Sequence, residues 1–240
     1  MVLARNAGRG IQRYAFRQMV MGWEHYQGVE REKDADKALL HTRRAARLRN
    51  RSAQNNLGMF YAIGIGVEQD LDQALRWFQR AEKGARTGNA QYNLGYMHYH
   101  GEGVPQDDEQ ARLFFEKSAE RDFPLSHWYL GEIHRLGRGV EIDPEKAFQH
   151  YWQAAMLGHG PGFRSAGWSY WTGEGVEPNP VKAYALTLIA VAYFGDGVHT
   201  QLAKMHPQIT PEQIGEAEIL STQLYEEYAV MDFADLHGDR

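Results

Sequence analysis

The sequence predicts an all-α fold, a solenoid of about five helix-pair repeats that ends in capping helices. Two observations predict it. A motif of glycines and small residues recurs every 36 or 37 residues along the 240-residue chain, which is typical of stacked repeats. Within each period, small and apolar residues recur at intervals of four, which is the spacing along one face of an α-helix.

The repeating motif reads Leu-Gly-x-x-Tyr/His-x-x-Gly-x-Gly-Val, and an alanine follows each copy at a constant distance. A fifth, less regular copy lies upstream and includes Gly22, Gly28 and Ala38. Because several columns recur together, chance spacing does not explain the pattern. The four regular copies begin at Leu57, Leu94, Leu130 and Ala166.

Each repeat is predicted to form two helices. A glycine in the middle of the first helix, such as Gly95, costs about 1 kcal/mol relative to alanine, so its recurrence needs a reason. We expect close packing, since a residue without a Cβ lets the second helix approach the first. The Gly-x-Gly-Val turn ends the first helix with glycines of positive φ. The acidic or polar residues after it suit the positive end of the next helix dipole.

These residues resemble the Sel-one-like repeat (SLR) family, a relative of the tetratricopeptide repeat, over roughly residues 15–195. The resemblance implies a right-handed α-α superhelical solenoid that binds other proteins. His98 and His134 stand where the family usually has tyrosine, and Glu30 replaces the second turn glycine of the first copy. The chain has no cysteine, unlike the disulfide-rich secreted members of the family.

The predicted domain organisation has four parts. A basic extension over residues 1–14 precedes the repeat array over residues 15–195, and capping helices over 196–231 precede a frayed tail over 232–240. The run from Thr210 to Gln213 is typical of an N-cap, a first-turn proline and a capping box at the last helix. The repeats are expected near residues 15–50, 51–87, 88–123, 124–159 and 160–195.

Charge is distributed unevenly along the chain. Residues 1–51 carry twelve Lys/Arg and five Asp/Glu, whereas residues 52–240 carry fourteen and twenty-six. Both ends can simply be solvated, or the chain can associate head to tail or present its basic end to an acidic partner. The acidic majority of the surface disfavours binding of nucleic acid.

Four arginines spaced by four residues would form one basic stripe on an N-terminal helix. We interpret the stripe as a solvated capping face, with contact to a membrane surface or an acidic partner as the alternative. No run of about 20 apolar residues predicts a membrane span. No apolar signal core follows the N-terminus, so we expect a cytoplasmic protein. The stripe consists of Arg5, Arg9, Arg13 and Arg17.

One face of the first helices is predicted to bind a partner protein. The family geometry implies that the side opposite the alanine and leucine columns lines a concave surface. This side is rich in aromatic residues and arginines, which dominate binding hot spots. The alternative is that several of them are buried between repeats. The predicted partner-binding residues are Trp23, Tyr26, Tyr92, Tyr96, Tyr99, Trp128, Glu132, Arg135, Arg164, Trp168 and Trp171.

No catalytic, metal or cofactor site is predicted. His98, His100 and His134 suggest a metal site, but no carboxylate is spaced to complete the ligand set. The glycine pairs of the turns lack the preceding strand and the following Gly-Lys-Ser/Thr of a phosphate loop. We therefore expect a non-catalytic scaffold or adaptor. The alternative is an inhibitor or immunity-type protein that occludes an enzyme's active site, and a hydrolase is the weaker third hypothesis.

Overall fold

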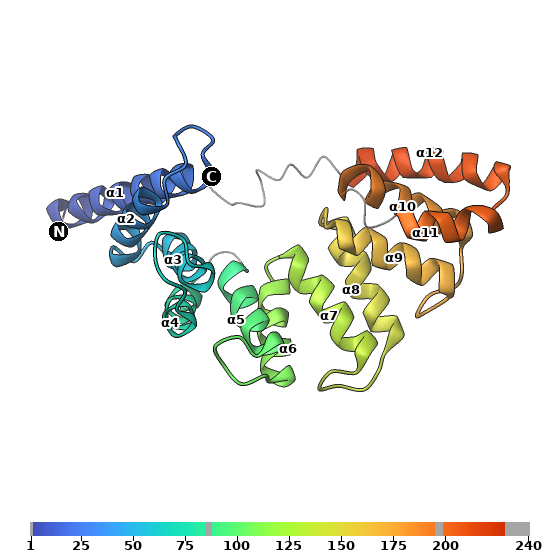
Figure 1. Ribbon diagram of the computed structural model, residues 1–240, viewed down its shortest axis with the longest axis horizontal. Coiled ribbons are helices and arrows are strands. Elements are labelled where there is room, and N and C mark those ends of the chain that lie inside the picture. Colours follow the sequence, from blue (N-terminus) through green and yellow to red (C-terminus); the bar gives the residue numbers. More distant parts are fainter. Residues whose placement is uncertain (1, 85–87, 195–198, 229–240) are drawn as a thin grey trace. The chain divides into compact units, whose positions relative to one another are not determined.

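The structure is a computed structural model that describes residues 2–84, 88–194 and 199–228 (Figure 1), and the predicted frayed tail at 232–240 lies outside them. The described residues form helices and no β-strand, which confirms the predicted all-α fold. The helices are α1 (Val2–Gln27), α2 (Ala35–Arg47), α3 (Arg51–Ile63), α4 (Leu71–Glu82), α5 (Asn89–His100), α6 (Asp108–Ala119), α7 (Pro124–Leu136), α8 (Pro144–Met156), α9 (Gly160–Thr172), α10 (Pro180–Phe194), α11 (His199–Met205), the 3-10 turn η2 (His206–Gln208) and α12 (Pro211–Tyr228).

The helices follow one another as five pairs, from α1–α2 to α9–α10, and α11, η2 and α12 come after the last pair. The chain divides into two compact units, residues 1–111 and residues 112–240. In the first unit α1 packs on α2, α2 on α3, α3 on α4, and α4 on α5. In the second unit α7 packs on α8, α8 on α9, and α9 on α10. Packing of each helix on its chain neighbours is the pattern expected of a repeat protein.

A glycine in the middle of the first helix lets the second helix pack directly against it. A Cβ added to Gly58 would lie 2.6 Å from the ring of Phe78 in α4. A Cβ added to Gly131 of α7 would overlap the ring of Tyr151 in α8. Any larger residue would have to separate the helices, so the predicted close packing is confirmed.

The second glycine of each turn approaches the preceding helix pair. A Cβ on Gly66 would lie 2.5 Å from the carbonyl oxygen of Ala35 at the start of α2. A Cβ on Gly103 would lie 2.7 Å from the Cβ of Leu71 at the start of α4. Glu30 occupies the equivalent position in the first copy.

A short polar residue begins the second helix of each pair. The carboxylate of Asp70 accepts a hydrogen bond from the backbone N–H of Gln73 at 2.9 Å, and the N–H of Asp70 donates to the carbonyl of Tyr61 at 2.9 Å. These residues are therefore side-chain N-caps, which satisfy a free N–H directly in addition to favouring the helix dipole. The residues in this role are Asp34, Asp70, Asp107, Asp143 and Asn179.

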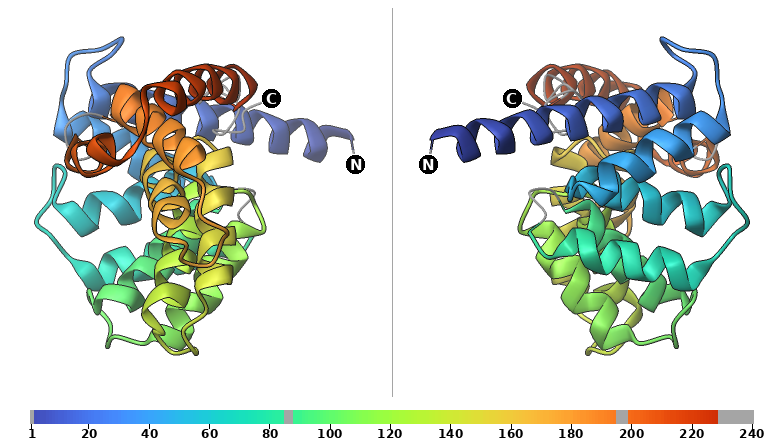
Figure 2. Two further views of the ribbon diagram at one scale, coloured as in Figure 1. Left: turned by 90° about the vertical axis from the view of Figure 1, so that its right-hand side faces the viewer. Right: turned by 90° about the vertical axis from the view of Figure 1, so that its left-hand side faces the viewer.

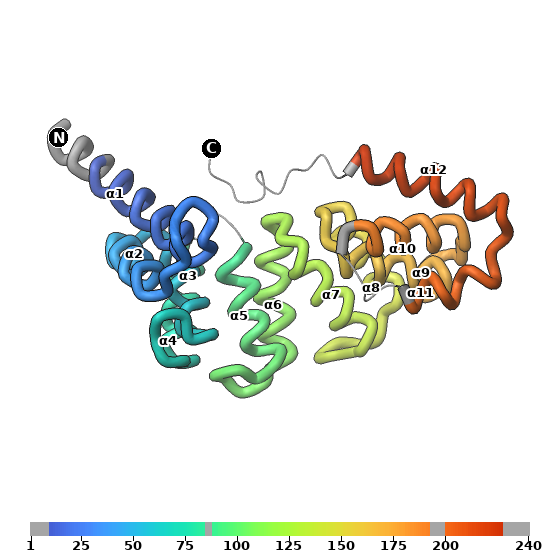
Figure 3. Tube along the Cα trace, turned by 45° about the horizontal axis from the view of Figure 1, so that its top comes forward, coloured from blue at the N-terminus to red at the C-terminus, as the bar shows by residue number. Residues whose placement is uncertain are grey.

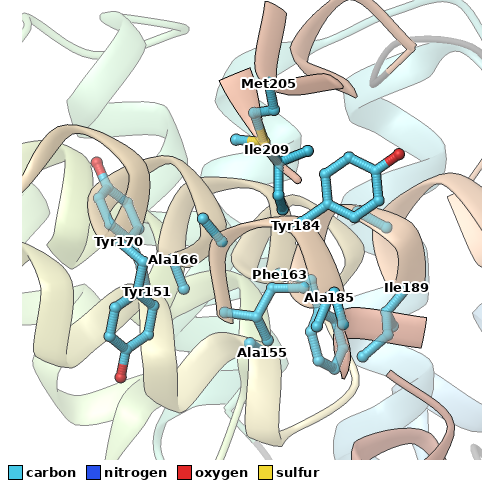
Figure 4. Packing of buried hydrophobic residues seen from close by; sticks show 14 of the residues in the cluster. Tyr151, Ala155, Phe163, Ala166, Tyr170, Tyr184, Ala185, Ile189, Met205 and Ile209 are labelled. Carbon is cyan, nitrogen blue, oxygen red and sulfur yellow. The ribbon is translucent and has the colours of Figure 1, made fainter. Parts of the chain in front are cut away.

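The core of the second unit includes the C-terminal helices. Phe163 of α9 and Ile189 of α10 pack in one buried cluster with Met205 of α11 and Ile209, which follows η2 (Figure 4). Helix α12 runs beside α10 (Figure 3) and adds Ala217 to the cluster. At its start, Thr210 and Gln213 exchange side-chain to backbone hydrogen bonds of 3.0 and 3.3 Å, which confirms the predicted capping box.

Helix α1 is much longer than the helix on which it packs. It has 26 residues, whereas α2 has 13. The N-terminal half of α1 therefore extends past the end of α2 (Figure 2). The cluster that holds the first unit together lies at the other half of α1, where Met19 and Tyr26 pack against Leu39, Leu57 and Phe60.

Candidate protein-binding surface

All eleven predicted partner-binding residues lie on the first helices of their pairs: α1 and α5 in residues 1–111, and α7 and α9 in residues 112–240. Most of their side chains are partly buried. Arg135 is exposed, whereas Tyr99 is buried, with 9% of its surface exposed. The residues on α1 and α5 belong to one unit, and those on α7 and α9 belong to the other.

In α1 the two predicted aromatic residues lie together. The ring centroids of Trp23 and Tyr26 are 5.2 Å apart, and the ring of Tyr26 lies 5.3 Å from that of Phe60 in α3. Because Phe60 is fully buried, Tyr26 connects this part of α1 to the core. Trp23 is the outer member of the pair and keeps part of its surface exposed.

In α5 the three predicted tyrosines form a row with His100. The ring of Tyr96 lies 6.2 Å from that of Tyr92 and 4.3 Å from that of His100, and Tyr99 lies 4.9 Å from His100. Burial and the nearby Glu102 carboxylate raise the pKa of the Tyr96 hydroxyl, so this hydroxyl stays uncharged at neutral pH. The row therefore offers aromatic rings and neutral hydroxyl groups.

In the second unit Trp128 connects consecutive repeats. Its indole Nε1 donates a hydrogen bond of 3.2 Å to the Oγ of Ser165 in α9, and its ring meets the edge of His159 at 6.3 Å. Burial, with a smaller effect of the Arg164 charge, lowers the pKa of His159 to about 4. The imidazole is therefore neutral at pH 7, and Trp128 lies between uncharged neighbours.

Glu132 and Arg135 of α7 form an ion pair that also engages the buried Tyr151 of α8. Arg135 Nη2 lies 2.5 Å from Glu132 Oε2, and the Tyr151 hydroxyl donates to Glu132 Oε1 at 2.5 Å. Burial and the Glu132 carboxylate raise the pKa of Tyr151, so its proton stays in place. Glu132 thus accepts a hydrogen bond from the buried hydroxyl of Tyr151 and holds the more exposed guanidinium of Arg135 at the surface.

Trp168 and Trp171 of α9 pack against the core cluster of the second unit without being fully buried. The Nζ of Lys204 in α11 lies 5.7 Å from the centre of the Trp168 ring, within range of a cation–π interaction. Lys204 was missed in the sequence because it lies outside the repeat and so has no equivalent from which to infer its position.

A histidine cluster on the other side of α7 was also missed. His127 Nδ1 lies 3.3 Å from His150 Nδ1, and the ring of His134 stacks on that of His150 at 5.7 Å. Burial lowers the pKa of His150 to about 4, and the neighbouring His127, His134 and Lys146 act in the same direction. The cluster borders a pocket of about 650 Å³. The residues that line this pocket are Arg112, Glu116, His134, Val140, Glu141, Ile142, Asp143, Lys146 and His150.

Among the described residues no group of three or more His, Asp or Glu side chains is arranged to hold a metal ion. In the same part of the chain, no helix combines the length and the apolar character that crossing a membrane requires.

Comparison with known proteins identifies the family of the chain and solved structures with the same fold. The profile of the Sel1 repeat matches five segments that together span more than half of the chain. No curated protein matches the chain. The matched segments are residues 18–50, 51–84, 88–123, 124–159 and 163–192.

Solved structures that are similar to this chain include the three that follow. A protective antigen of uropathogenic Escherichia coli with an SLR fold has a TM-score of 0.81 and 28% identity over 94% of this chain, which spans only 48% of that protein. A Sel1 repeat protein from Oxalobacter formigenes has a TM-score of 0.75 and 23% identity, with 87% of each chain covered. An immunity protein from Pseudomonas aeruginosa has a TM-score of 0.54 and 21% identity, covering 92% of this chain and 83% of its own. The latter two show the fold alone.

Proposed function

Because the chain belongs to the Sel1 repeat family, we propose that it is a non-catalytic scaffold or adaptor that binds a partner protein through the aromatic side of its first helices. Sel1 repeat proteins generally mediate protein–protein interactions, and the family is generally non-catalytic. The partner-binding residues are those predicted from the sequence. They lie on α1 and α5 in the first unit and on α7 and α9 in the second.

The observation that carries the proposal is the state of the tryptophans in α7 and α9. Trp128, Trp168 and Trp171 keep part of their surface exposed although each packs against the core cluster. On the second helices, Phe115 and Tyr151 are 0% and 3% exposed, whereas Trp152 of α8 is partly buried. Large aromatic side chains that are accessible but fixed are suited to recognition, because little rotamer freedom is lost on binding.

The polar residues on the same side support this interpretation. Arg135 is held at the surface by Glu132, and Trp168 lies beneath the ammonium group of Lys204. Tryptophan and arginine are the residue types enriched in binding hot spots. The surface of the second unit therefore fits a protein segment that offers apolar side chains and an acidic or carbonyl group to Arg135.

The proposal is tested with Trp168→Ala and a matched control, Trp77→Ala. Trp77 is also partly buried and also has a cation–π contact, with Arg80 at 4.6 Å, but it lies on a second helix. Once a partner is identified by affinity purification, we expect Trp168→Ala to weaken binding by about 2 kcal/mol, or about 30-fold in Kd. The control should bind as the wild type does.

Thermal unfolding of both variants completes the test. If Trp168 only fills space between repeats, its replacement should lower stability by about 3–5 kcal/mol. The folded fraction would then bind its partner normally. That result would contradict the proposed surface, whereas weaker binding by a stable, folded variant would support it.

An inhibitor or immunity-type protein is the second candidate. The similar immunity protein supplies the reason to consider it, although the likeness extends only to the fold. The two functions differ in what happens to the partner. An inhibitor abolishes the activity of a bound enzyme at stoichiometric amounts, whereas an adaptor leaves that activity intact. Enzyme assays on the product of a neighbouring gene, with and without this protein, distinguish them.

A further inference from the structure

The N-terminal half of α1 exposes a face that is buried further along the same helix. Positions 11, 15, 18 and 22 lie on one face by helical spacing. Ala15 is fully buried, Gln18 is 6% exposed with its Oε1 2.7 Å from His41 Nδ1, and Gly22 lies against α2. Ile11 continues this row but is 50% exposed, and the N-terminal half of α1 extends past the end of α2 (Figure 2).

The exposed half of α1 is both apolar and basic. Tyr14 lies beside Ile11 by helical spacing and is 50% exposed. Arg17 and then Arg13 follow Tyr14 around the helix on the side away from Ile11, and both are exposed. The helix has four arginines, and its one acidic residue lies near the other end. A face of this kind fits a partner surface that is apolar at its centre and acidic around it.

Helix α12 has a surface of that complementary kind. It contains five glutamates and no lysine or arginine. Glu212, Glu216, Ile219, Gln223 and Glu226 follow one another at helical spacing on one face, and all five are exposed, Ile219 by 62%. The side of α12 that includes the buried Ala217 packs on the core of the second unit, so this acidic face points away from that core.

We propose that α1 of one copy of this chain packs on α12 of a second copy. The contact places Tyr14 against Ile219 and Arg17 near the glutamates, with Arg13 at the edge of the contact. Pairing α1 with another α1 would bring arginines together, and pairing α12 with another α12 would bring glutamates together, so charge selects the head-to-tail arrangement. Such a contact is heterologous, and further copies can add until the assembly closes into a ring or continues as a chain.

The test begins with the mass of the full-length wild-type protein by sedimentation velocity at several concentrations. The pairing of exposed charges is screened by salt, so we expect the mass to rise with concentration at low salt and to return to that of one copy at about 0.5 M salt. A wild-type protein with the mass of one copy at every concentration and salt would overturn the proposal.

Charge reversal identifies the two surfaces. One variant carries Arg13→Glu and Arg17→Glu, and the other carries Glu216→Arg and Glu226→Arg. Each should have the mass of one copy by itself, whereas their equimolar mixture should associate again, because each reversed face finds its opposite on the other variant. Circular dichroism checks that both variants are folded.

A matched control carries Glu68→Arg and Glu120→Arg, which change the net charge equally at exposed positions outside α1 and α12. It should associate as the wild type does. Variants that still associate alone, or a mixture that stays as single copies, would overturn the head-to-tail contact. A contact between α1 and α12 of one chain would leave the mass unchanged throughout, which also overturns it.

Discussion

The two sides of α7 place different demands on their residues. Toward α8, Gly131 lies against the ring of Tyr151 with no room for a Cβ, and His127 lies within 3.3 Å of the neutral His150. On the other side, Trp128 keeps exposed surface while it donates a hydrogen bond to Ser165 of the next repeat, and Arg135 is exposed beside Glu132. The first side determines whether the repeat folds, and the second is available for recognition. Substitutions on the two sides should therefore affect different properties.

The largest effect is expected at the glycine. Gly131→Leu should lower the free energy of unfolding by about 3 kcal/mol or more, because the side chain would force α7 and α8 apart. Urea unfolding measures the change. Gly215 of α12 is the control, since no atom lies within 4 Å of an added Cβ there. Gly215→Ala should raise stability by up to about 1 kcal/mol through helix propensity. If Gly131→Leu is as stable as the wild type, the side of α7 that faces α8 does not depend on close packing at this glycine.

A pH effect of intermediate size should come from the same packed side of α7. The pKa of His150 is lowered to about 4, so the folded protein favours the neutral ring. Above pH 6.5 the unfolding free energy should not depend on this group. Between pH 6.5 and pH 4 the unfolded chain takes up the proton first, so stability falls, by about 2 kcal/mol at pH 5.

Variants separate this histidine from its neighbours. His159, whose pKa is also lowered to about 4, contributes a loss of the same sign. Burial also lowers the pKa values of His41, His127 and His134. His150→Gln should therefore remove less than half of the decrease between pH 7.5 and pH 5, as measured by urea unfolding at the two pH values. If the variant and the wild type lose stability equally, His150 is not held neutral by the fold.

The smallest effect is expected on the aromatic side. Trp128→Phe keeps a ring but removes the hydrogen bond to Ser165, which should lower stability by about 0.5–1 kcal/mol. Ser165→Ala should have a similar effect, and the double variant should cost little more than either change alone. Thermal melts of the wild type and the three variants complete a double-mutant cycle. Fully additive losses would show that the two side chains do not interact.

Much of the scaffold could be predicted from the sequence because the same spacing of glycines and apolar residues recurs in several repeats. The helix pairs, the packing role of glycines such as Gly58 and the capping box at Thr210 depend on local spacing. The N-caps at Asp70 and its equivalents were predicted only as favourable charges. Their hydrogen bonds depend on backbone angles that the sequence pattern does not specify.

The candidate surface was predictable only in outline. Helical spacing placed Trp128 and Trp168 on one side of the first helices, but not the degree of burial that distinguishes them from Tyr99. It also missed the contact of Lys204 with Trp168 and that of His127 with His150. In each contact the two side chains come from different helices, so the repeat period of the sequence does not show that they are neighbours.

The sequence by itself determined the repeat period, the helix pairs and the side of each helix that packs, because these follow from helical geometry and the size of single residues. Tertiary structure alone decided which rings stay exposed and which imidazoles are held neutral. Those properties depend on what another helix places nearby, and therefore on distances across space rather than along the chain.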